Sequence, residues 1–96
     1  MWLLQQSDGD VAQFNVPIHL ALDDSDGSLF VVDVCNRRVA LVSRRLDLVG
    51  DVAARHQFRW YPMRVCLDAG RRLLYVADNE MKDGDDARGR VVVISV

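Results

Sequence analysis

Two copies of one stretch of sequence restrict the fold more than any other feature of this chain. Residues 17–33 read PIHLALDDSDGSLFVVD, and residues 62–78, forty-five positions later, read PMRVCLDAGRRLLYVAD. Without a gap, the copies share a proline, two leucines, a valine and two aspartates at equivalent positions. A repeat of about 45 residues with several short strands is typical of a β-propeller blade. The chain is therefore predicted to be a repeat protein.

Short apolar runs between turn residues predict strands rather than helices. The first unit has such runs at 18–22, 28–34, 39–43 and 46–52, and the second has them at 65–68, 73–78 and 90–96. Asp, Ser and Gly, as in DDSDG at 23–27, provide the turns. We therefore predict an all-β chain with about two four-stranded antiparallel blades, the second without its fourth strand.

The apolar pattern also predicts how these sheets are arranged. Positions 29–32 are all apolar, which indicates a strand covered on both faces. Two stacked sheets would cover only two of their four faces, whereas radial stacking about an axis covers them all. We expect an incomplete propeller ring, in which residues 1–13 end a preceding blade or form an N-terminal strand, 14–52 form blade 1 and 53–96 form blade 2. Further blades in cis, or another copy, would cover the exposed faces.

The order of these segments resembles the NHL repeat. PIHLALD, SLFVVD and NRRVALVS follow one another from 17 to 43, and the second copy keeps PMRVCLD, RLLYVAD and GRVVVIS but has an insertion at 80–89. The resemblance implies a propeller of about six blades. It also implies a non-catalytic binding module, such as the substrate-recognition part of a tripartite-motif ubiquitin ligase whose catalytic activity would lie outside this chain. The alternative is part of a propeller enzyme of the peptidyl-hydroxyglycine lyase or lactonase type.

Charge and aromatic residues indicate where such a module would bind. Residues 37–72 hold nine Arg against three Asp, and the flanks are acidic. The loops 34–38, 53–61 and 79–89 are expected at one end of the blades. Their mixture of cations and rings suits single-stranded RNA, whereas the acidic insertion suits a protein partner better. The candidate binding residues are Arg37, Arg38, Arg55, His56, Arg59, Trp60, Tyr61 and Arg90.

Three other polar residues have a structural interpretation. Asp33 and Asp78 end equivalent strands, and we expect them to accept N–H groups of the following turn. Asn36 fits the same turn because it tolerates left-handed backbone angles. Arg38 and Arg90 have pairing with a strand aspartate as an alternative to ligand binding. Because Phe14 precedes Pro17, at least one aromatic residue of the 53–61 loop is expected to plug the space between blades.

The sequence offers no catalytic constellation. Cys35 and Cys66 are too few and too far apart for a disulfide scaffold or a zinc site, and we expect them to be small buried residues. The histidines, His19 and His56, belong to different blade positions, and the Asp-Gly clusters lack the ligand spacing of a calcium loop. We predict no metal and no cofactor. The apolar runs are too short to span a membrane or form a signal peptide, so a cytoplasmic protein is expected.

Overall fold

A computed structural model describes residues 2–5 and 11–96 of the chain, with side chains from residue 14 onward. The described elements are β1 (Trp2–Gln5), β2 (Val11–Phe14), β3 (Pro17–Asp23), β4 (Ser28–Asp33), β5 (Arg38–Val42), β6 (Leu48–Ala53), the 3-10 helix η1 (Arg55–Gln57), β7 (Tyr61–Asp68), β8 (Leu73–Asn79) and β9 (Gly89–Ser95). The prediction of an all-β chain is confirmed.

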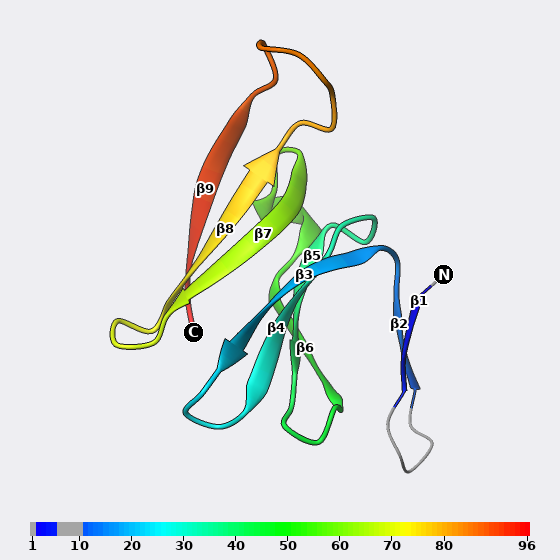
Figure 1. Ribbon diagram of the computed structural model, residues 1–96, viewed down its shortest axis with the longest axis vertical. Helices are drawn as coiled ribbons and strands as arrows, with labels where there is room; N and C mark the ends of the chain where they lie inside the picture. The colour runs from blue at the N-terminus through cyan, green and yellow to red at the C-terminus, as the bar shows by residue number, and fades with distance from the viewer. Residues whose placement is uncertain (1, 6–10) are drawn as a thin grey trace.

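The strands form antiparallel sheets in which each strand pairs with the next along the chain (Figure 1). β1 and β2 pair with each other, β3 to β6 form a four-stranded first sheet, and β7 to β9 form a three-stranded second sheet. Both larger sheets have a register shift just after their first proline, between Pro17 and His19 and between Pro62 and Arg64. The sequence repeat is therefore also a repeat of backbone structure. β2 ends at Phe14 and β6 at Ala53, one residue beyond the expected ends of their units.

Each sheet has two faces, which we name by the neighbour they turn toward. In the first sheet, one face carries the cross-strand set Ala21, Phe30 and Leu41 and the set His19, Val32 and Val39. We call it the C-side face because it packs on the second sheet. The opposite, N-side face carries Leu20, Val31 and Ala40, and Leu22, Leu29 and Val42. This alternation follows from the two-residue period of a strand.

The main core lies between the two sheets. Phe30, Val32 and Val39 on the C-side face of the first sheet meet Val65, Leu74, Val76 and Ile94 on the N-side face of the second. Phe58 joins this core from the loop before β7 and is buried, which confirms the prediction of an aromatic plug. A smaller core forms on the N-side face of the first sheet, where Phe14 packs with Val31, Ala40 and Val42. Both faces of the first sheet are thus used, as the apolar run at 29–32 predicted.

Two polar contacts also hold the sheets together. Arg72 donates from Nη2 to Asp23 Oδ2 at 2.8 Å, and the Val65 amide donates to His19 Nδ1 at 3.1 Å. Arg72 adopts a φ of 53°, and Gly27, its equivalent in the first unit, has a φ of 77°. Glycine adopts this conformation at little cost, whereas arginine does not. We infer that the ion pair with buried Asp23 offsets the backbone cost at Arg72.

Acid is expected to weaken this contact. The pKa of Asp23 is lowered from its ordinary value of 3.8 to about 2, mainly by hydrogen bonds from Arg72 and Ser25. A carboxyl group with a lower pKa in the folded state stabilises the fold above the unfolded pKa, and this stability is lost as the pH falls from about 4 to about 2. The Tm followed by circular dichroism should fall across this range, and the fall should be smaller in Asp23→Asn. The same fall in both proteins would contradict this assignment.

Candidate functional site

Asp33 and Asp78 are fully buried and organise the end of the sheets where the candidate loops lie. Asp33 accepts hydrogen bonds from the Asn15 amide at 2.7 Å, from Asn36 Nδ2 at 2.7 Å and from Arg38 Nε at 2.9 Å. Asn36 lies in the following turn, as expected, but the left-handed backbone predicted for it is found at its neighbour Arg37, whose φ is 50°. The backbone donor was predicted wrongly, because it comes from the segment before β3. Asp33 thus connects the segment before the first strand of its sheet with the start of the third strand.

Asp78 repeats this arrangement in the second sheet. The amides of Arg59 and Trp60 donate to it at 2.8 and 2.9 Å, and Arg90 Nε donates at 2.9 Å. Burial by itself would raise the pKa of Asp78, but the hydrogen bonds from Arg90 and from the two amides outweigh it and hold the pKa below its ordinary value. The carboxylate is therefore charged at neutral pH and fixes the backbone of the loop that carries Arg59 and Trp60.

Three of the candidate binding arginines have their donors directed into the protein. Arg38 pairs with Asp33 and also reaches Asp51 Oδ1 at 3.2 Å. Arg90 pairs with Asp78 and donates to the Gln57 carbonyl at 3.0 Å. Arg37 donates to the Arg59 carbonyl at 3.2 Å and lies 5.0 Å from the centre of the Tyr61 ring. These contacts bind the three candidate loops to one another.

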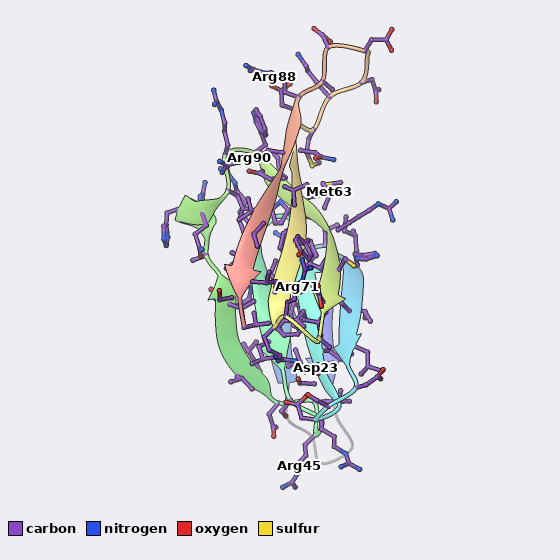
Figure 2. The ribbon with its side chains drawn as sticks, turned by 90° about the vertical axis from the view of Figure 1, so that its left-hand side faces the viewer. Asp23, Arg45, Met63, Arg71, Arg88 and Arg90 are labelled. Atoms are coloured by element: carbon purple, nitrogen blue, oxygen red, sulfur yellow. The ribbon has the colours of Figure 1, made fainter. Side chains whose placement is uncertain are left out.

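A second group of basic residues remains on the surface of the same loops. Arg55 and His56 lie on η1 and are exposed, as is Arg59. The guanidinium groups of Arg59 and Arg88 lie 5.2 and 5.6 Å from the centre of the half-buried Trp60 ring. We call Arg55, His56, Arg59, Trp60 and Arg88 the loop cluster. Figure 2 shows Arg88 and Arg90 toward one end of the molecule and Arg45 at the opposite end.

Arg88 was not among the binding residues predicted from the sequence, because it lies in an insertion that has no equivalent in the first unit. Arg88 and Lys82 both form ion pairs with Glu80. Arg88 Nε is 2.7 Å from Glu80 Oε1, and Lys82 Nζ is 3.3 Å from Glu80 Oε2. These partners lower the pKa of Glu80, with Arg88 contributing most. The one clue in the sequence was the spacing of Glu80 and Arg88 across the base of the loop that joins two strands. The insertion therefore folds back and places a cation beside Trp60.

Acidic and apolar side chains lie next to the loop cluster. The insertion exposes Asp83, Asp85 and Asp86 together with Met81. A hollow of about 410 Å³ is lined by Met63, Glu80, Met81, Lys82 and Asp83. This end of the molecule thus combines cations, carboxylates and thioether groups. Surfaces of mixed character are usual where proteins bind other proteins.

The described residues contain no group of three or more His, Cys, Asp or Glu side chains that could hold a metal ion. Cys35 and Cys66 are free thiols, and both are exposed, so the prediction that they are buried was wrong. Cys66 is equivalent to Ala21, which the second sheet partly covers, but the corresponding face of the second sheet has no neighbouring sheet within residues 11–96. Nor does any helix in the described part of the chain have the length and hydropathy needed to cross a membrane.

The sequence and the structure were compared with known proteins. No protein-family model, no curated protein and no solved structure matches the chain.

Proposed function

We propose that this chain is a non-catalytic binding module built from propeller-type blades like those of NHL repeats. It uses the loop cluster to bind an acidic segment of a protein partner. The observation that carries the proposal is the pair of guanidinium groups over the Trp60 ring, on a loop whose backbone Asp78 holds in place. Arginines ordered in this way are suited to binding carboxylates with two parallel hydrogen bonds.

The contacts of Trp60 favour a protein over single-stranded RNA. Binding of RNA bases relies on exposed aromatic faces on which the bases stack. Here Arg59 and Arg88 already lie against the Trp60 ring, and Tyr61 lies under Arg37. The neighbouring carboxylates of the insertion repel a continuous phosphate backbone more than a peptide whose few carboxylates are spaced to meet only the cations. A polypeptide with a few acidic residues meets the cations without covering the whole mixed surface.

The resemblance to NHL repeats supports a role in recognition, such as choosing the substrate of a ubiquitin ligase. In that setting the chain supplies affinity for the substrate, and another part of the assembly carries out the reaction. The contacts of the candidate arginines agree with such a division, because Arg37, Arg38 and Arg90 stabilise the loops while the loop cluster faces solvent.

The proposal is tested by titrating labelled ligands and following fluorescence anisotropy. An Asp- and Glu-rich peptide should bind, and Arg59→Ala and Arg88→Ala should each weaken binding about 1.4- to fivefold, because an exposed ion pair contributes about 0.2–1 kcal/mol. Binding should weaken as salt is added. Arg45→Ala is the matched control, since Arg45 is exposed and lies at the opposite end (Figure 2).

Two outcomes would contradict the proposal. An equal loss in Arg45→Ala would show that net charge, and not the loop cluster, drives binding. Tighter binding of a single-stranded uridine oligonucleotide than of the acidic peptide would assign the loop cluster to RNA instead.

A further inference from the structure

The C-side face of the second sheet is an apolar surface without a cover in the described structure. Val91 and Val93 on β9 are 64% and 54% exposed. Beside them lies a hollow of about 300 Å³, lined by residues of all three strands and by His19. In the first sheet the equivalent positions are Val39 and Leu41, and Val39 is fully buried against the second sheet. The uncovered face thus corresponds to a face that, one unit earlier, receives a neighbouring sheet.

The complementary surface lies on β3, at the other end of the chain. Leu20 and Leu22 on the N-side face of the first sheet are 55% and 54% exposed. Their equivalents on β7 are Val65, which is buried, and Leu67, which packs against the main core. The N-side face of the first sheet and the C-side face of the second sheet are therefore both exposed. Within the chain, the other two faces of the same kinds pack against each other, which shows how the exposed pair would fit.

The second sheet also lacks a fourth strand within the described residues. β9 pairs with β8 on one edge only, whereas the equivalent strand β5 pairs with both β4 and β6. Figure 1 shows β9 as the outermost strand of its sheet. An unpaired strand edge offers a row of N–H and carbonyl groups to an added strand.

A strand with the character of a fourth strand is present near the N-terminus. The sequence GDVA occurs at 9–12 and again at 50–53 in β6, and each copy is followed by QF, at 13–14 and at 57–58. The likeness extends to packing. Phe14 ends β2 and packs on Val31, Ala40 and Val42, while Phe58 follows β6 and shares a core with the equivalents Val76, Val92 and Ile94. β2 therefore enters the first sheet much as β6 enters the second.

We propose that β2 of a second copy of this chain adds to the open edge of β9 as the missing fourth strand. The N-side face of that copy's first sheet then covers Val91 and Val93. Both contacts form at once, because β2 leads directly into β3 as β6 leads into β7 through η1. The contact joins two different surfaces, so it repeats from copy to copy until a ring closes.

The contact between copies is weaker than the contact within one chain. Within one chain, Arg72 of the second sheet binds Asp23 of the first. Between two copies, Gly27 takes the place of Arg72 and Asp68 takes the place of Asp23, so no ion pair can form. In addition, β1 already pairs with β2 and occupies the edge that β9 would take. Association is therefore expected to depend on concentration and to compete with the β1–β2 pair.

Sedimentation velocity over a range of concentrations tests the proposal. The wild-type chain should form discrete oligomers, and Val93→Glu and Leu20→Arg should each weaken association at least tenfold by placing a charge in one half of the contact. The new arginine of Leu20→Arg would also lie near Arg64 of the other copy. Leu20 is equivalent to Val65 and Arg64 to His19, and Val65 and His19 are in contact within one chain. Met81→Glu is the control, because Met81 is equally exposed but lies outside both surfaces.

Mixing Val93→Glu with Leu20→Arg distinguishes this specific contact from non-specific hydrophobic association. Each variant keeps one intact half, so an equimolar mixture should form a one-to-one complex at concentrations where each variant alone is a monomer. Leu3→Pro, which disfavours the β1–β2 pair, should strengthen association of the otherwise unchanged chain. A monomer at all concentrations, an equal effect of Met81→Glu, no complex in the mixture, or weaker association of Leu3→Pro would each overturn the proposal. Val93→Glu, Leu20→Arg and Leu3→Pro lie away from the loop cluster and its neighbouring hollow, so ligand binding is tested separately in these three variants.

Discussion

Replacing Asp78 by alanine is expected to lower the free energy of unfolding by about 2–4 kcal/mol, because two partly buried backbone N–H groups lose their acceptor at about 1–2 kcal/mol each, whereas Arg90 is 48% exposed and can bind water instead. The Asp78 carboxylate has no exposed surface and binds Arg90 Nε at 2.9 Å together with two backbone amides. Its removal leaves a guanidinium group and two N–H groups without their acceptor. Urea unfolding at pH 7, followed by circular dichroism, measures this loss.

Two other variants show whether burial is the cause. Arg90→Met leaves the buried Asp78 carboxylate with its two amide donors but without its cation, and should also destabilise the protein by more than about 1 kcal/mol. Asp51→Ala removes an acceptor that also pairs with an arginine, but Asp51 is 39% exposed, so its loss should cost less than about 1 kcal/mol. Equal losses in Asp78→Ala and Asp51→Ala would show that the buried carboxylate does not organise this end of the sheet.

Asp78 connects the fold to the proposed binding surface. The two amides that it accepts belong to Arg59 and Trp60, which are members of the loop cluster. Arg90 adds a second tie by donating to the Gln57 carbonyl in the same loop. We therefore expect Asp78→Ala to reduce peptide binding even at temperatures where the variant remains folded.

The repeat allowed the strands of the two units and their order to be predicted from the sequence, whereas β2 and its pairing with β1 were not predicted. Strand boundaries followed from apolar runs and turn residues that both copies share, such as Pro17 and Pro62. The pairing of Arg38 and Arg90 with strand aspartates was among the alternatives considered, because each arginine opens the third strand at the end where the second strand carries its aspartate. Local spacing was sufficient wherever both partners belong to neighbouring strands.

Contacts between units were not predictable in the same way. The amide donors to Asp33 and Asp78 come from residues 18 or more positions away, so spacing within one turn gave the wrong donors. Arg72 bonds to Asp23 across 49 positions, and only the packing of the two sheets shows this pairing. Arg88 reaches Trp60 because the insertion folds back, which no repeat equivalent indicates. Exposure of Cys66 likewise depends on which sheet faces it.

Phe58→Ala is expected to destabilise the protein by about 3–5 kcal/mol, as is usual when a buried phenylalanine is truncated to alanine. Phe58 is buried in the core between the sheets, among Val65, Leu74 and Val76. Its removal leaves a cavity that the surrounding strands cannot fill without breaking their pairing. The change is measured as a lower midpoint in urea unfolding.

Trp60→Ala provides the matched comparison, because Trp60 follows Phe58 by two positions in the same loop. Its ring is only half buried and contacts the side chains of Arg59 and Arg88 at the surface. Stability should change by less than about 1.5 kcal/mol, while binding of the acidic peptide should weaken about tenfold, because both arginines lose the ring that orders them. If Trp60→Ala instead unfolded the protein as Phe58→Ala does, or left peptide binding intact, Trp60 would belong to the scaffold and the loop cluster would not be the binding surface.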